Sequence, residues 1–347
     1  MKLRSLIQWT AGLVLAAAGM WIFFRNIDTH KLASLLVHGN PLQIVCCAVF
    51  AVMAIWFRSL RSALLLPVCS PAQKKNLFPI LMISFMINNI LPARMGEAAR
   101  AMLLWKRNGY SGAVSVGSII LERILDTVVY MSTFFIPVFF VPGLAGSSGA
   151  GGQARALTMQ TVALAFCAGF VLFAVLLAAY SRFPTAVRAL GVRIASAKFV
   201  PDHLRSRINR IGKELISNLE WTFSARRVAE IVALSYAIVS CYGGMAMVLI
   251  HEKTFGFLHG LFAQAFAALG AAIPLAPGYV GTLHAIFLQG LVLCGVERDK
   301  AGAATIIFHA VAYITVTLLG LYYYFRFQVK FKDISKASDE IEKNEAL

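Results

Sequence analysis

Long apolar runs divide this chain into segments that a water-soluble fold has no room to bury. Six runs with few charges lie at about 6–24, 41–66, 113–141, 158–180, 228–250 and 301–325. Each is near the ~20 residues that an α-helix needs to cross a bilayer. Backbone groups in hydrocarbon are satisfied only in helices or closed barrels, and barrel strands would alternate polar and apolar residues. We therefore predict an all-α, polytopic membrane helix bundle with six full spans.

The composition agrees with a membrane protein. Aliphatic, aromatic and sulfur-containing residues make up 59% of the 347 residues and charged residues 14%, whereas soluble domains average about 45–50% and 25%. The first run follows Lys2 and Arg4 but lacks a small-x-small cleavage site, so we interpret it as a retained helix. The six cysteines have no metal-ligand or C-x-x-C spacing. We therefore expect no metal site and no cofactor.

Two further segments, 77–105 and 256–296, are interrupted near the middle by proline and glycine. Proline removes a helical hydrogen bond and clashes with the preceding turn, so each segment is predicted to be a pair of short helices joined by a break. Each pair is either a re-entrant hairpin or two full crossings, and the sequence leaves both open. In both cases the chain returns to the side from which it came.

Lysine and arginine orient the bundle, because cytoplasmic loops retain them. The segment 181–227 contains ten basic and three acidic residues. With this segment inside, the N-terminus and the tail at 326–347 are both cytoplasmic, and we expect a protein of the bacterial inner membrane. Apolar residues at helical spacing in 181–227 indicate an amphipathic helix that either lies on an anionic leaflet or only anchors the topology. The net charge of +16 favours anionic lipid over nucleic acid as a partner.

The order of spans and broken pairs occurs twice, with opposite orientation. Residues 1–142 hold two spans, a broken pair and one span, and residues 158–325 repeat this order after a Gly/Ser-rich outside linker at 143–157. The two breaks share a P-x-x-x-G pattern, PARMG in the first half and PGYVG in the second. Broken helices at matching positions of an inverted repeat are typical of transporters and indicate a binding site near the midplane.

Charged residues inside the predicted spans cluster in the first half of the chain. They are Arg58, Arg61, Arg94, Glu97, Arg100, Glu122, Arg123 and Asp126. Burying each one costs about 2.5–3.5 kcal/mol on insertion scales, so each needs a partner, a wet cavity or the interface. Either these residues pair with one another and lock the first half together, or the arginines receive an anionic head group beside helix N-termini freed at the break.

Four polar residues near the breaks and the last span have open roles. Asn88 and Asn89, just before the first break, are expected to satisfy open backbone groups or to add hydrogen bonds to a ligand. In the second half, His284 and His309 occupy approximately the positions that correspond to Glu97 and Glu122 in the first half. A membrane histidine is more often a packing residue than a proton relay, and proton coupling stays an alternative for these two.

Three stretches of the chain, NNILPARMGEAAR, SIILERILDTV and PLAPGYVGTLHAIFL, resemble the lysylphosphatidylglycerol synthase transmembrane-domain family, also described as flippase-like. The resemblance implies a role in moving lipid between leaflets. It maps the motifs P-x-R-x-G-E and E-R-x-x-D of the family onto Pro92, Arg94, Gly96, Glu97, Glu122, Arg123 and Asp126. After the second break the family commonly has an acid, whereas this chain has Thr282, Leu283 and His284. We expect this protein to lack the soluble synthase domain of the bifunctional members, and therefore expect no aminoacyl transfer.

These features together predict a flippase-like transporter that binds or moves an anionic or glycosylated lipid, such as a phospholipid, hopanoid or polyprenyl-linked lipid. No G-x-x-x-x-G-K-[ST] motif occurs, so no ATPase activity of its own is expected. The alternatives are a membrane-embedded transferase on a lipid-linked substrate and an accessory subunit with a lipid-synthesis enzyme as partner. No catalytic residue is assigned. The candidate substrate-binding residues are Asn89, Pro92, Arg94, Gly96, Glu97, Arg100, Glu122, Arg123, Asp126, Pro277, Gly278, Gly281, His284 and His309.

Overall fold

The computed structural model describes residues 3–25, 27–37, 39–67, 69–91, 94–141, 225–272 and 277–329. Several predicted features lie outside these described residues, namely the linker at 143–157, the span at 158–180, most of the basic segment at 181–227 and most of the tail at 326–347. The architecture below is that of the described residues.

Every regular element within the described ranges is a helix, as the apolar runs predict. In chain order the elements are α1 (Leu3–Phe24), α2 (Thr29–Val37), α3 (Pro41–Leu65), α4 (Pro71–Ile90), α5 (Met95–Asn108), α6 (Gly112–Phe140), α10 (Ala225–Ile250), α11 (Phe257–Ala272), the 3₁₀ turn η1 (Pro277–Tyr279), α12 (Thr282–Leu293) and α13 (Arg298–Arg326). Five of the six predicted spans therefore coincide with helices, and the sixth, at 158–180, is outside the described residues.

Short polar side chains cap the N-termini of several of these helices. The Asn40 side chain accepts a hydrogen bond from the backbone N–H of Leu42, at the first turn of α3. At α4, Ser70 and Gln73 form a reciprocal capping box, and Ser111 caps α6. These side chains satisfy N–H groups that have no partner within the helix. The helix starts are therefore encoded locally.

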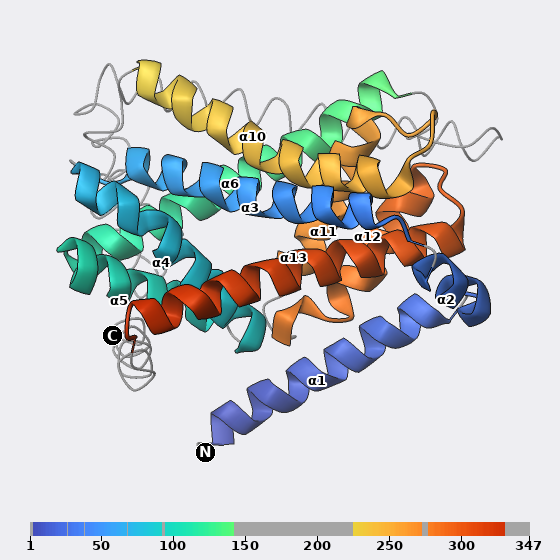
Figure 1. Cartoon of the computed structure of the whole chain (residues 1–347), viewed down its shortest axis with the longest axis horizontal. Coiled ribbons are helices and arrows are strands. Elements are labelled where there is room, and N and C mark those ends of the chain that lie inside the picture. The colour runs from blue at the N-terminus through green and yellow to red at the C-terminus, as the bar shows by residue number, and fades with distance from the viewer. Residues whose placement is uncertain are drawn as a thin grey trace, which may run out of the picture.

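Three of the described helices, α3, α10 and α13, are long and apolar enough to cross a membrane. They pack against one another, and Figure 1 shows them as long helices that run across the view. Helix α3 also carries a stripe of exposed apolar side chains at helical spacing, namely Leu42, Val45, Val49, Trp56 and Leu60. An exposed apolar stripe of this kind suits contact with lipid.

Both predicted helix interruptions are confirmed. Helix α4 ends at Ile90 and α5 begins at Met95, while α11 ends at Ala272 and α12 begins at Thr282. Within each pair the two short helices pack against each other. The chain turns sharply at both breaks, where Arg94, Gly278, Tyr279 and Gly281 all have positive φ. A left-handed backbone is costly for residues other than glycine, so Arg94 and Tyr279 are held there by their surroundings.

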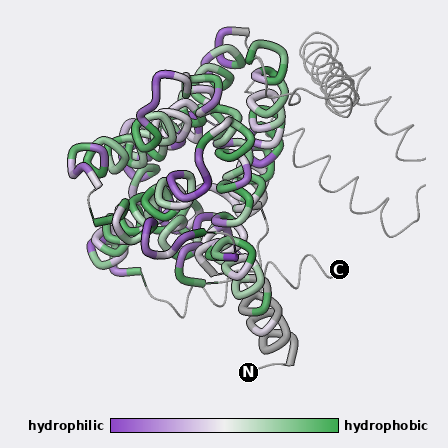
Figure 2. The backbone as a smooth tube through the Cα atoms, turned by 90° about the vertical axis from the view of Figure 1, so that its right-hand side faces the viewer, coloured by the Kyte–Doolittle hydropathy of each residue, from purple (hydrophilic) through white to green (hydrophobic). Residues whose placement is uncertain are grey.

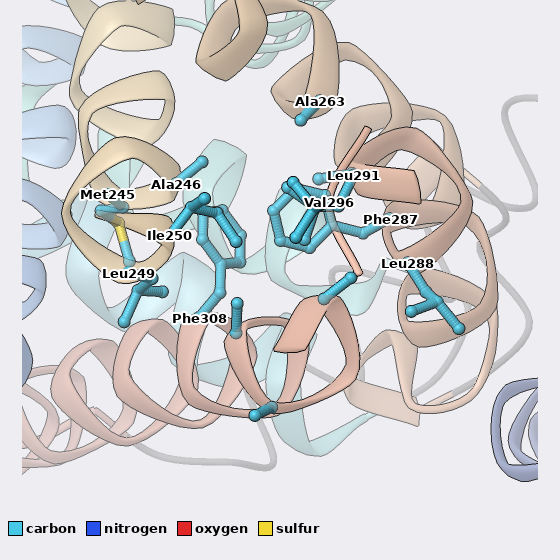
Figure 3. Packing of buried hydrophobic residues seen from close by; sticks show 14 of the residues in the cluster. Met245, Ala246, Leu249, Ile250, Ala263, Phe287, Leu288, Leu291, Val296 and Phe308 are labelled. Atoms are coloured by element: carbon cyan, nitrogen blue, oxygen red, sulfur yellow. The ribbon is translucent and has the colours of Figure 1, made fainter. Parts of the chain in front are cut away.

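An apolar core joins α10, α11, α12 and α13 (Figure 3). The rings of Phe287 from α12 and Phe308 from α13 lie at its centre, with centroids 4.5 Å apart. Met245 and Ile250 of α10 pack from the side. Not all of the interior is apolar, because Figure 2 shows hydrophilic stretches of the tube inside the helical body as well as at its edges.

The first helix packs directly on the second break. A Cβ placed on Gly19 of α1 would lie 2.4 Å from the carbonyl carbon of Gly281, and a Cβ on Gly281 would lie 2.2 Å from the carbonyl oxygen of Ala16. Both distances are far inside van der Waals contact, so the two backbones touch without intervening side chains. This approach fixes α1 against the start of α12.

An ion-pair cluster holds α2 against the start of α13. Lys31 pairs with Glu297 and with Asp299, the latter at 3.3 Å, and the backbone N–H of Asp28 donates to Asp299 Oδ1 at 3.1 Å. The Lys31 ammonium donates hydrogen bonds to Glu297 and Asp299, and these raise its pKa above the usual value. A raised pKa in the folded state adds stability below the ordinary lysine pKa of about 10.4, and this is lost as pH rises through the raised value.

We therefore expect Lys31→Met to lower the thermal unfolding temperature slightly at neutral pH, because exposed ion pairs contribute little. The difference from the wild-type protein should vanish in the alkaline range above the raised pKa, as the wild-type lysine loses its proton. Lys31→Arg, whose charge persists, should keep its stability over the same range. A difference between Lys31→Met and wild type that does not change with pH would contradict this account. Thermal unfolding in detergent as a function of pH is the measurement.

Candidate functional site

A cavity of about 420 Å³ lies in the middle of the helical body, bordered by both breaks and by the long helices α3, α6, α10 and α13. Its charged lining residues are Arg58, Arg94, Glu97, Arg123 and Asp126. The cavity thus gathers side chains from both halves of the chain around a polar centre. It has the size of a small-molecule or head-group site rather than of a packing defect.

The two breaks meet at this cavity. Arg94, at the start of α5, donates from Nη2 to the carbonyl oxygen of Ala271 near the end of α11, at 3.3 Å. The carbonyl oxygen of Asn89 accepts from the Tyr313 hydroxyl at 3.3 Å and lies 3.0 Å from where a Cβ on Gly278 would be. Gly278 therefore allows η1 to approach the end of α4.

Asp126 of α6 is the centre of one ion-pair network. Arg58 Nη1 lies 2.9 Å from Asp126 Oδ2, Arg61 Nη1 lies 2.7 Å from Oδ1, and Arg123 Nη1 lies 3.7 Å from Oδ2. The buried Arg61 also donates to Ser235 Oγ of α10 at 2.9 Å. This network ties α3 and α10 to α6.

Glu97 of α5 belongs to a second, looser group. Its Oε1 atom lies 3.8 Å from Arg94 Nη1 and 3.5 Å from Arg123 Nε. All three side chains line the cavity. The same carboxylate oxygen therefore faces two guanidinium groups, without the close contact of a strong charge-assisted hydrogen bond.

Arg100 and Glu122 form a third group, which does not line the cavity. The Arg100 guanidinium donates to both carboxylate oxygens of Glu122, at 2.6 and 2.7 Å, and to Ser62 Oγ at 2.9 Å. Both side chains are buried. This bidentate pair joins α5 to α6 and to α3, as expected for residues that lock the first half together.

Arginines outnumber carboxylates in these three groups. The arginines are Arg58, Arg61, Arg94, Arg100 and Arg123, and the carboxylates are Glu97, Glu122 and Asp126. In addition, the buried Nε atoms of Arg58 and Arg61 have no hydrogen-bond partner among the described residues. Of these residues, Arg58, Arg94, Arg123, Glu97 and Asp126 line the cavity. The described lining therefore still has more arginines than carboxylates, and such a site suits an anion. Among the described residues, no group of three or more His, Cys, Asp or Glu side chains could hold a metal ion.

Gly96 sets the geometry of the first break. Its backbone N–H donates to Asn88 Oδ1 at 2.8 Å, and its carbonyl accepts from Ser84 Oγ at 2.7 Å. Asn88 therefore satisfies an open backbone group, as predicted. Asn89 Nδ2 donates to Thr317 Oγ1 of α13 at 2.9 Å. Pro92 is outside the described residues.

The two predicted histidines are in contact. The N–H of Gly281 donates to His284 Nδ1 at 3.3 Å, and His284 Nε2 lies 3.4 Å from His309 Nδ1. Because Nδ1 of His284 is an acceptor, a neutral His284 carries its proton on Nε2 and donates to His309. His309 lines the cavity, whereas His284, Gly281 and Pro277 do not. The pair links the second break, at Gly281, to α13. Proton coupling through these histidines stays a hypothesis.

Several lining residues are absent from the sequence-based candidates. Among them are Tyr130, Tyr242, Gln264, Tyr279 and Tyr313. Gln264 stands in an apolar helix, and this is a signal that sequence reasoning can use. Arg58 and Asn88, which also line the cavity, are among the polar residues singled out from the sequence. The tyrosines give no such signal, because a tyrosine in a membrane helix more often lies at the interface.

The helices, the outward apolar stripe and the internal polar cavity define an integral membrane protein. Residues 9–320 match the family model described as "Lysylphosphatidylglycerol synthase TM region", and the chain belongs to this family. The resemblance drawn from the three motifs is thus confirmed.

The chain is also similar to three archaeal proteins, each named a UPF0104 membrane protein. One from Methanothermobacter thermautotrophicus is 22% identical over 337 residues, which cover 92% of this chain and 95% of the relative. One from Methanocaldococcus jannaschii is 19% identical over 310 residues, with 85% and 87% covered. A second from that organism is 22% identical over 242 residues, with 67% and 91% covered. These relatives support the membrane class and name no substrate.

Proposed function

We propose that this protein binds an anionic or glycosylated lipid by its head group in the central cavity and moves it between the leaflets. The phospholipid, hopanoid and polyprenyl-linked classes all fit this proposal. The observation that carries it is the excess of arginine over carboxylate around a cavity where two helix breaks meet. Excess positive charge within a membrane is costly unless an anion offsets it. The acyl chains would stay in the bilayer while the head group crosses.

The proposed architecture is an inverted repeat of six spans and two broken pairs, with both termini in the cytoplasm of a bacterial cell. The contact of Arg94 with Ala271 and of Asn89 with Tyr313 supports it, since the first break then lies against elements of the second half. In inverted-repeat transporters the site lies at such a junction, and the halves rock around it. Lipid movement would be downhill, coupled to an ion or driven by a partner.

Replacing Arg94 with alanine is expected to slow transport of a fluorescent phosphatidylglycerol across vesicle membranes by about tenfold or more, because losing one partner of a close charge contact commonly costs ~2 kcal/mol or more. The readout is the fraction of labelled lipid that an external quencher reaches over time, in vesicles that contain the purified full chain. Wild-type protein should accelerate this exchange relative to protein-free vesicles.

Arg107→Ala is the matched control for this experiment. Arg107 lies in the last turn of α5, the helix that Arg94 precedes. It is exposed and contacts the carbonyl oxygen of Phe327. Its loss removes the same charge from the chain but not from the cavity, so transport should stay at the wild-type rate. Equal rates in the wild-type protein and Arg94→Ala would rule out the proposed site. Turnover of an added lipid-linked donor by the purified protein would instead favour a transferase.

A further inference from the structure

The ion pairs around the cavity fall into two kinds. In the first kind the contacts are short and the carboxylates are buried. Glu122 is 1% exposed at 2.6 Å from Arg100, and Asp126 is 8% exposed at 2.7 Å from Arg61. Opening either pair would leave a buried charge without that partner, which is strongly unfavourable. These carboxylates are fixed parts of the fold.

The second kind is the group of Arg94, Glu97 and Arg123. Here the N–O distances are 3.5 and 3.8 Å, and the three side chains are 29%, 29% and 35% exposed. Glu97 reaches both guanidinium groups with one oxygen, Oε1, and forms a close hydrogen bond with neither. A partly exposed and long ion pair is weak. Glu97 can therefore leave this position at small cost.

The surroundings keep both partners stable after such a departure. Arg123 retains its contact with Asp126, and Arg94 retains its hydrogen bond to the Ala271 carbonyl. Glu97 stands in the first turn of α5, where the helix dipole favours a negative charge even without an ion-pair partner. Arg94, Glu97 and Arg123 all line the cavity, so a ligand in it can reach them.

We propose that Glu97 is an internal substitute for the ligand, and that a phosphate group takes its place between Arg94 and Arg123. This inference rests on the proposed function and narrows it to a phosphate-bearing anion that binds by exchange. A phosphate presents several oxygens to two guanidinium groups at once and can form the close hydrogen bonds that Glu97 does not. Binding then trades two long ion pairs for shorter ones, while the displaced Glu97 carboxylate stays in the first turn of α5, where the helix dipole favours its charge.

The test compares binding of short-chain phosphatidylglycerol to the full chain in neutral detergent, by isothermal titration calorimetry. Glu97→Gln removes the competing charge and keeps the size of the side chain, so its affinity should rise by about tenfold, because the bound phosphate no longer meets a like charge beside it. Glu97→Asp, which keeps the charge, should raise the affinity less than Glu97→Gln does. Arg94→Gln and Arg123→Gln should weaken binding. Glu97→Ala is a second charge-removing variant, and size-exclusion profiles show which variants are folded.

Glu230→Gln is the matched control. Glu230 pairs with Arg226 on the surface, at 3.0 Å, and is 43% exposed, so its loss removes the same charge away from the cavity. Tighter binding by Glu230→Gln equal to that of Glu97→Gln would show a general charge effect and overturn the exchange proposal. Wild-type binding that neither Glu97→Gln nor Glu97→Ala strengthens would also overturn it, while leaving the head-group site in place.

Soluble glycerol 3-phosphate and short-chain phosphatidylcholine distinguish the source of the phosphate. If glycerol 3-phosphate binds as tightly as the lipid and Glu97→Gln strengthens it equally, the exchange holds but the ligand is a soluble phosphate, which contradicts the lipid function. If phosphatidylcholine binds as tightly as phosphatidylglycerol, the site recognises the phosphate and tolerates the positive choline group. That result supports the exchange proposal and contradicts a requirement for a lipid of net negative charge. If no phosphate compound binds the wild-type protein or any variant, both proposals fall.

Discussion

Alanine at position 96 is expected to prevent α5 from packing on α4 and to leave little folded protein. The added Cβ would lie 1.9 Å from the Ser84 carbonyl oxygen and 2.6 Å from Asn88 Oδ1. Because the first of these atoms is backbone, no rotamer change removes the clash, and one helix has to move. That movement breaks the hydrogen bonds of Gly96 to Asn88 and to Ser84. Overpacking and the lost buried hydrogen bonds together should cost on the order of 3 kcal/mol or more.

Gly112→Ala is the control for this substitution. Gly112 begins α6, and a Cβ there would have no neighbour within 4 Å among the described residues. Alanine should be neutral or slightly stabilising at this position, because it lowers the conformational entropy of the unfolded chain. The yield of monodisperse protein and the temperature at which half of it is lost on heating in detergent are the measurements. Similar values for Gly96→Ala and wild type would mean that the break is looser than described.

Glu122→Gln and Arg100→Met are each expected to destabilise the protein by about 3–5 kcal/mol, the usual cost of leaving one member of a buried ion pair without its partner. The pair is bidentate, and both side chains are almost completely buried. Neither residue lines the cavity. The loss should therefore appear in thermal stability in detergent, with transport reduced only in proportion to the folded fraction.

The double variant Arg100→Met with Glu122→Met separates pairing from burial. It leaves no charge behind, so it should recover much of the stability that either single variant loses. If the double variant loses the sum of the two single effects, the two residues act independently and the pair is not the unit described. If the single variants keep full stability but abolish transport, the pair belongs to the transport site instead.

The helices and their ends are largely readable from the sequence. Local signals determine them: the caps Asn40, Ser70 and Ser111 begin helices, and the P-x-x-x-G pattern marks both breaks. Such signals act over a few residues and do not depend on what the helix later packs against. The interruption of both predicted segments follows from them, as does the use of Asn88 to satisfy backbone at the first break.

The pairing of charges is not readable in the same way. Spacing alone places Glu97 equally near Arg94 and Arg100, but in the structure Arg100 turns to Glu122, 22 positions away. Likewise Arg58 meets Asp126 across 68 positions. Which arginine meets which carboxylate depends on how α3, α5 and α6 pack, and no local pattern records it. The sequence therefore predicts the members of the charged cluster but not its division into fixed and exchangeable pairs.

The position of the tyrosines at the cavity cannot be predicted from the sequence, for a related reason. Tyr242 and Tyr313 stand in apolar helices, and only the contact between the halves turns them toward the polar centre. The repeat places His284 and His309 at positions that match Glu97 and Glu122, but it does not predict that the two histidines meet, as they do in the structure. Their contact depends on α12 lying against α13, which the repeat pattern alone does not specify.

The backbone contact between Gly19 and Gly281 constrains how this protein can move. Where two helices meet through side chains, rotamer changes let them slide, but here carbonyl groups and α-carbons touch directly. Sliding of α1 along the second break would require these two backbone segments to separate first. Any motion that opens the cavity to opposite sides in turn must therefore carry α1 and α12 as one rigid body. Helix α1 then moves together with the second break and does more than hold the N-terminus in the membrane.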